Sequence, residues 1–189
     1  MLLLMAMQPP APAMAHPHIF IDCKAIAVFD ASGLTGFQQT WIFDEMFSAG
    51  MLMEYDTNGD QQFNAAETAK YAQEIFSILK EYNYLTVLRV DGEEIHPHQA
   101  RDFRPEVRNG QLIYHFFTPC VVPFASGTHN VAISVYDPEY YADMVLLDSA
   151  VSVEAPPGVQ TAKSNVSAPE LTYFGCIVPV FINLRFSAP

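Results

Sequence analysis

The stretch HIFIDCKAIAVFDASGLTGFQQTWIF, residues 18–43, decides the fold. Residues 18–29 are rich in β-branched and aromatic side chains, which predicts a strand. Asp30-Ala31-Ser32-Gly33 has the composition of a tight turn, and residues 34–43 again favour a strand. The chain therefore opens with a β-hairpin.

Beyond this hairpin the pattern changes to helical spacing and then returns to short strands. Residues 44–55 and 65–83 predict two helices. The strand-like runs that follow are 84–90, 111–118, 129–136, 145–154 and 178–186, whereas residues 155–169 are polar and predict a loose connection. This order predicts an α+β fold, an antiparallel β-sheet or sandwich with an inserted EF-hand-like helix pair at about 44–83.

Composition limits the class of protein. The 189 residues are 50% hydrophobic and fit one domain. A formal charge of −12 argues against nucleic acid or anionic lipid as a partner and favours cations. The three cysteines lack a Cys-x-x-Cys spacing, so we expect structural roles, with Cys23 buried on a strand and a disulfide such as Cys120 with Cys176 at most.

Residues 1–15 have the apolar run and the cleavage pattern of a signal peptide but not its basic start. They carry no charge, begin with an apolar run and end in Ala13-Met14-Ala15, an Ala-x-Ala cleavage pattern. The segment contains prolines and is too short to span a bilayer as a helix, so stable membrane insertion is not expected. Cleavage after Ala15 would leave one periplasmic domain, residues 16–189, that begins with a histidine.

This new terminus is a candidate transition-metal site. His16 would offer its α-amine and its imidazole, and His18 a second imidazole. Because side chains alternate along a strand, Asp22 is expected on the same face as both histidines. Pro17 has no amide hydrogen, which excludes a square-planar amide chelate. A histidine brace for copper and a tetrahedral zinc site both remain open, as do nickel and cobalt.

His96-Pro97-His98 repeats the same tripeptide further along the chain. A proline between two histidines favours an extended backbone that sends both rings to one side. His96 and His98 are therefore second candidate ligands. Acidic residues that could complete either site are Asp44, Glu45 and Asp137.

Residues 56–67 match a twelve-residue calcium loop between the two predicted helices. The predicted ligands are Asp56, Asn58, Asp60, the carbonyl of Gln62, Asn64 and Glu67. Gln61 stands where glycine normally permits the sharp turn. We expect a structural calcium ion here, because a single loop of this kind is typical of stabilisation and not of signalling.

With these motifs in view, the chain resembles a bacterial family described as the uncharacterised periplasmic component of an ABC-type transport system. The resemblance rests on residues 16–22, Thr40-Trp41-Ile42-Phe43-Asp44-Glu45-Met46-Phe47, residues 56–67 and Val135-Tyr136-Asp137-Pro138-Glu139-Tyr140. It implies a periplasmic protein associated with nickel/cobalt permeases or zinc uptake, without an established reaction. Gln61 departs from the glycine of that family.

The function expected from these features is a metal-binding accessory protein that captures a divalent transition metal and delivers it to an inner-membrane permease or ABC transporter. Two alternatives stay open: a copper redox enzyme with a histidine brace, and a calcium-stabilised interaction module that uses Trp41 and tyrosines. No Gly-x-Ser-x-Gly, Gly-rich phosphate loop or His-Glu-x-x-His motif is present, so an ordinary hydrolase or nucleotide enzyme is not expected.

Overall fold

The first hairpin of the computed structural model forms as predicted. The structure describes residues 17–124, 127–173 and 177–188, in which β1 (Ile19–Asp30) pairs antiparallel with β2 (Gly33–Phe43). The Asp30 carboxylate closes the turn by accepting the amide N–H groups of Ser32 (2.7 Å) and Gly33 (3.2 Å). Gly33 has a φ of 144°, and a Cβ there would collide with the carbonyl oxygen of Val122, so the turn requires glycine.

The hairpin lies inside a five-stranded sheet of order β5-β6-β2-β1-β8. Its other strands are β5 (Arg101–Arg108), β6 (Gln111–Pro123) and β8 (Ala142–Glu154). β5 was not predicted, because its alternating charges and its proline conceal the strand pattern of an edge. β8 runs parallel to β1, so one pair departs from the predicted antiparallel arrangement.

A second five-stranded sheet has the order β4-β3-β7-β10-β9. Its strands are β3 (Thr86–Val90), β4 (Glu93–Ile95), β7 (Thr128–Val135), β9 (Gln160–Ser167) and β10 (Val180–Ser187), with a short 3₁₀ helix η2 (Pro169–Leu171) after β9. The prediction of a loose connection over 155–169 is wrong, because β9 pairs with β10. All eight β9 residues are exposed, so this edge strand has no apolar face to detect.

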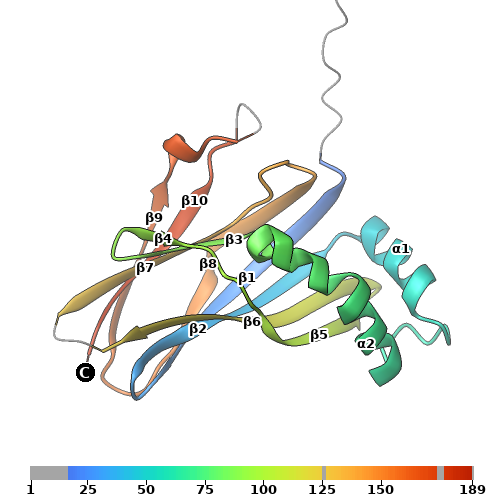
Figure 1. Ribbon diagram of the computed structural model, residues 1–189, viewed down its shortest axis with the longest axis horizontal. Coiled ribbons are helices and arrows are strands. Elements are labelled where there is room, and N and C mark those ends of the chain that lie inside the picture. The colour runs from blue at the N-terminus through green and yellow to red at the C-terminus, as the bar shows by residue number, and fades with distance from the viewer. Residues whose placement is uncertain (1–16, 125–126, 174–176, 189) are drawn as a thin grey trace, which may run out of the picture.

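The two sheets pack face to face around a shared hydrophobic core (Figure 1), which confirms the α+β sandwich. The rings of Phe29 in β1 and Phe186 in β10 meet edge to face at 4.8 Å. Cys23 and Cys120 are buried free thiols. Burial raises the pKa of Cys120 to about 11 and the pKa of Cys23 further, so both stay neutral. Cys176 lies outside the described residues.

The helical insertion lies between β2 and β3, as predicted, but its second helix is interrupted. It comprises α1 (Glu45–Tyr55), α2 (Ala65–Glu74) and the 3₁₀ segment η1 (Phe76–Leu85). The single helix predicted over 65–83 therefore ends at Glu74. Aromatic rings join the insertion to the sheet: Phe76 stacks on Phe103 of β5 at 3.9 Å. No helix in the described part of the chain is long and apolar enough to cross a membrane.

Candidate functional site

The start of β1 carries the described part of the first histidine pair. His16 lies outside the described residues, whereas the His18 amide donates to the Tyr141 carbonyl oxygen at 2.9 Å. The His18 and Tyr141 ring centroids are 5.0 Å apart. His18 and Asp22 are exposed while Cys23 is buried, so the predicted shared face is confirmed for these two donors.

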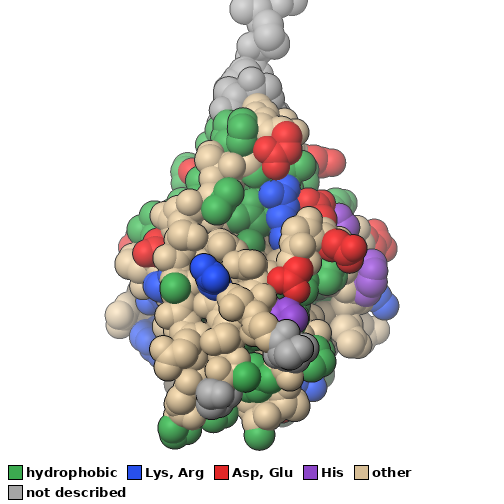
Figure 2. All heavy atoms as spheres, turned by 90° about the vertical axis from the view of Figure 1, so that its left-hand side faces the viewer, with side chains coloured by type: hydrophobic (Ala, Val, Ile, Leu, Met, Phe, Trp, Pro, Cys, Tyr) green, Lys and Arg blue, Asp and Glu red, His purple; other side chains and the backbone are tan. Residues whose placement is uncertain are grey.

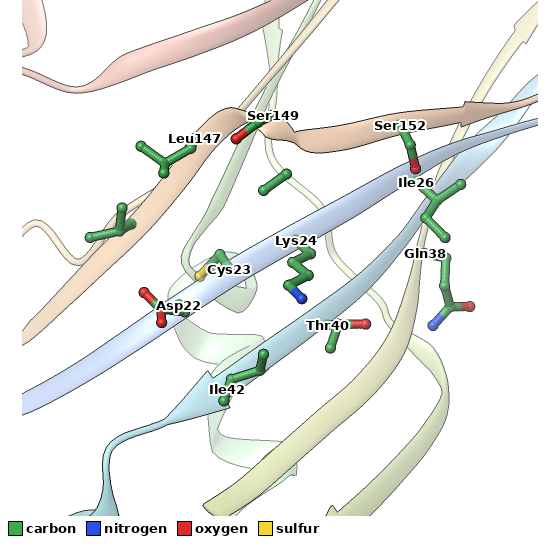
Figure 3. Close-up of a pocket in the computed structure, with 12 residues that line it drawn as sticks. Asp22, Cys23, Lys24, Ile26, Gln38, Thr40, Ile42, Leu147, Ser149 and Ser152 are labelled. Carbon is green, nitrogen blue, oxygen red and sulfur yellow. The ribbon is translucent and has the colours of Figure 1, made fainter.

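Asp22 opens on a shallow pocket over the outer face of the first sheet (Figure 3). The pocket has a volume of about 600 Å³ and includes Lys24 of the same strand and Thr40 of the neighbouring strand β2. Lys24 follows Asp22 by two residues and therefore lies on the same face. The Lys24 ammonium group therefore opposes the binding of a cation to Asp22.

Two of the three acidic residues considered for completing the site, Asp44 and Asp137, have structural roles, whereas Glu45 is an exposed residue in the first turn of α1. Asp44 caps α1 by accepting the Met46 and Phe47 amides at 2.9 Å, and it accepts the Phe20 amide at 2.9 Å. Burial opposes ionisation, but these three amides hold the pKa of Asp44 below its ordinary value. The expectation that Asp44 completes a metal site is therefore not supported by its contacts.

Asp137 fixes the connection between β7 and β8, residues 136–141. Its carboxylate accepts the amides of Glu139, Tyr141 and Ala142, each at 3.0 Å. Only 9% of Asp137 is exposed, and its contacts to these three amides show a structural role. It also holds Tyr141 against His18.

His96, the first residue of the second histidine pair, lies at the other end of the same connection. His96 and His98 are exposed and Pro97 between them is buried. The His96 Nε2 lies 3.2 Å from the Glu94 Oε1. His96 also shares a cavity of about 100 Å³ with Tyr136 and Pro138. His96 therefore borders the residues 136–138, and His18 borders Tyr141.

Among the described residues, no three histidine, cysteine or acidic side chains are gathered closely enough to hold a metal ion. The two histidines outside the tripeptides are paired with carboxylates. His115 Nε2 lies 2.8 Å from Glu106, whose pKa this contact lowers, and its Nδ1 lies 3.3 Å from the Thr40 hydroxyl. His129 Nδ1 lies 2.8 Å from Asp91.

The loop over residues 56–67 has a backbone organised by its own acidic side chains. The Asp56 carboxylate accepts the amides of Gly59 (2.9 Å), Asp60 (3.2 Å) and Gln61 (2.7 Å). Gln61 has a φ of 59°, the left-handed conformation that glycine would adopt without strain. The sharp turn is therefore present although the glycine is not.

Glu67 closes this loop from the first turn of α2. Its carboxylate accepts the Thr57 hydroxyl (2.6 Å) and amide (2.8 Å) and the Asn64 amide (3.1 Å), which hold its pKa below the ordinary value. Asn64 caps the helix, so it too has a structural role. Calcium binding at the predicted ligands stays a prediction.

Two features of this region are not apparent from the sequence. Tyr141 belongs to no recognised motif, and only the tandem Tyr140-Tyr141 after Pro138 hints at an aromatic surface. Trp41 is 1% exposed and donates its indole N–H to Gln39. The expectation that Trp41 contacts a partner is therefore wrong.

Comparison with known proteins adds a family and two relatives. The sequence model of a family described as "Protein of unknown function (DUF1007)" matches residues 1–172. An "Uncharacterized 15.5 kDa protein in trpE 3'region" of Spirochaeta aurantia is 27% identical over 139 residues, 72% of this chain and 99% of that protein. An "Uncharacterized protein" of Haemophilus influenzae is 28% identical over 145 residues, 75% of this chain and 68% of that protein. The names of these relatives state no ligand, partner or reaction.

Proposed function

This chain belongs to the DUF1007 family of unknown function, and from that premise we propose that it is a periplasmic metal-binding accessory protein. It would capture a divalent transition metal and deliver it to an inner-membrane permease or ABC transporter. The proposed ligands are His16, His18 and Asp22, with His96 and His98 as a second pair. Zinc, nickel, cobalt and copper all suit imidazole donors.

The observation that supports the proposal is the position of His18 and His96, one histidine of each pair, beside residues 136–141. His18 contacts Tyr141 at one end of this connection, and His96 lines a cavity with Tyr136 and Pro138 at the other. His18 and His96, which are far apart in the sequence, thus border one six-residue segment.

Charge supports a cation as the ligand. The chain has 21 acidic and nine basic residues, and a surface of this sign raises the local concentration of cations. Figure 2 shows histidine side chains next to acidic side chains on the face that it presents. Glu94 provides a carboxylate 3.2 Å from His96 of the second pair.

The location also suits metal transfer. Strand pairing of β1 begins at Ile19, so the proposed donors His16 and His18 precede the paired strand. Segments near a chain terminus open at a lower free energy than strands in a core. A metal ion could therefore leave without unfolding of the sandwich.

Isothermal titration of the protein that begins at His16 tests the proposal. Zinc, nickel, cobalt and copper should be added separately at pH 7.5. At least one should bind, and His18→Ala should weaken that binding at least tenfold, since even changes in groups that only support ligands cost 10–100-fold. His129→Ala is the matched control, because His129 lies near the start of β7, at the opposite end of that strand from Tyr136. Absence of binding heat for all four metals would contradict the proposal.

We also propose a structural calcium ion in the loop over residues 56–67. The support is the pre-formed turn: Asp56 already holds three consecutive amides and Gln61 already has a positive φ. Carboxylate and carbonyl oxygens are the donors that calcium prefers. Such an ion would replace the contacts that Glu67 makes to Thr57 and Asn64 and would stabilise the α1–α2 junction.

A further inference from the structure

An apolar cavity lies between the helical insertion and the inner face of the first sheet. Its volume is about 200 Å³. Every residue that lines it is aliphatic or aromatic, including Trp41, Phe43, Phe47, Leu79, Tyr141 and Ala142. The Tyr114 hydroxyl, the polar atom of another lining residue, is hydrogen-bonded to Tyr71. The lining thus contains no charged group.

The segment that covers this cavity is strained. One wall of the cavity is formed by Ile75, which precedes η1, and by Leu79 and Leu85 of η1. η1 ends in three consecutive left-handed residues, Asn83, Tyr84 and Leu85, with φ values of 52°, 54° and 48°. Left-handed runs are unfavourable for residues with a Cβ, most of all for bulky ones. Strain of this kind persists where the surrounding structure enforces it, and it clusters at ligand sites.

We propose that this cavity binds the uncharged hydrocarbon portion of a small molecule, with η1 as its lid and residues 83–85 as the hinge. Protein interiors are packed with few voids larger than a water molecule. An apolar cavity of roughly 150 Å³ stays dry and accepts benzene, so one of about 200 Å³ accommodates about six to eight carbon atoms. Tyr141, which is 50% exposed, forms the rim through which the ligand enters.

The lining also defines what is excluded. A carboxylate or ammonium group inside the cavity would be desolvated without a hydrogen-bond partner, which is unfavourable. Binding should therefore select an uncharged chain over a charged one of equal length. A free hydrocarbon-like molecule and the end of a longer acyl chain share this chemistry. For a free molecule, affinity should stop rising with chain length once the cavity is full. For an acyl chain that extends beyond the cavity, affinity should continue to rise.

A chain-length series tests the proposal directly. The wild-type protein should be titrated with 1-pentanol, 1-hexanol, 1-heptanol and heptanoate. The readouts are the fluorescence of Trp41, which is the single tryptophan of the chain and lines the cavity, and saturation-transfer NMR of the ligand. The dissociation constant should fall about fourfold per methylene from pentanol to heptanol, and heptanoate should bind at least about tenfold more weakly than heptanol.

Extending the series to 1-decanol distinguishes the two ligand sources. A plateau beyond eight carbons indicates a free small molecule, and a continued rise indicates an acyl chain that leaves through the Tyr141 rim. Both outcomes support the hydrocarbon site. Failure of every alcohol to give saturable binding overturns it.

Two filling variants and one control complete the test. Leu79→Phe adds volume on the cavity wall, and Ala142→Leu does so from β8. Each should reduce heptanol affinity at least about tenfold. Ile78→Phe makes a comparable change at the adjacent position, which is 49% exposed and outside the lining, and should leave affinity unchanged. Equal affinity in all three variants would show that the alcohols bind elsewhere and would overturn the proposal.

Discussion

Addition of calcium should stabilise the fold through the loop over residues 56–67. Calcium sites in extracellular modules have dissociation constants of about 10⁻⁴ to 10⁻³ M. With about 2 mM calcium and a dissociation constant of about 0.2 mM, the stabilisation RT ln(1 + [Ca²⁺]/Kd) is about 1.4 kcal/mol. For a domain of this size, 1 kcal/mol shifts Tm by roughly 2–4 °C. The expected increase is therefore about 3–6 °C.

The backbone of Gln61 gives a second perturbation of the same loop. A left-handed conformation costs a residue with a Cβ roughly 1–2 kcal/mol, and the greater chain entropy of glycine offsets part of this in Gln61→Gly. We expect Gln61→Gly to raise Tm in the absence of calcium by about 1–3 °C. Gln62→Gly is the control, because Gln62 has no positive φ and should lose about 0.5–1 kcal/mol.

Thermal unfolding followed by circular dichroism measures both effects. The wild type and the Gln61 and Gln62 variants should be melted in calcium, in magnesium and in EDTA. A calcium-specific increase that disappears in Asp56→Ala supports the site. Identical melting in calcium and EDTA would refute cation binding at the loop. A Gln61→Gly variant that is as destabilised as Gln62→Gly would refute the backbone argument.

Three further predictions concern the rest of the site and the core. Asp137→Ala removes the acceptor of three amides, so it should lower the free energy of unfolding in denaturant by about 2–4 kcal/mol. It should also weaken metal binding at His18, and an unchanged metal affinity would show that metal binding does not depend on Asp137. Gln39→Leu leaves the buried indole N–H of Trp41 without a partner and should cost about 1–3 kcal/mol; a loss below that range would contradict this. The lowered pKa of Glu106 stabilises the fold above its unfolded value near 4.5, and this contribution is lost as pH falls through the folded value. Acid unfolding of Glu106→Gln should therefore depend less on pH below 4.5 than that of the wild type, and an unchanged dependence would contradict the assignment.

The parts of the fold that the sequence predicts are those whose apolar residues face one core. Burial alternates along β1 from Ile21 and along β2 from Phe37, and the boundaries of both strands agree with the predicted strands to within one residue. β9 could not be predicted, because an edge strand that is exposed on every residue has no periodicity. The end of α2 at Glu74 was missed for a different reason: the apolar spacing continues into η1, and only tertiary packing imposes the 3₁₀ geometry.

The candidate site likewise has features that the sequence predicts and features that it does not. Alternation along β1 correctly predicts that His18 and Asp22 share a face, because that property is local. The pairing of His115 with Glu106 depends on the neighbouring strand β5, which carries too many charges to be recognised as a strand. The approach of His96 to Tyr136 depends on how residues far apart in the chain fold together, and no spacing rule reports that.

Native mass spectrometry of the protein purified from the periplasm tests the central claim most directly. It reports the N-terminal residue and any retained ion in a single spectrum. The account predicts a chain that begins at His16 and carries a transition-metal ion, which is lost when His16 and His18 are both replaced by alanine. A chain that begins elsewhere, or a metal content that the double substitution does not change, would contradict it.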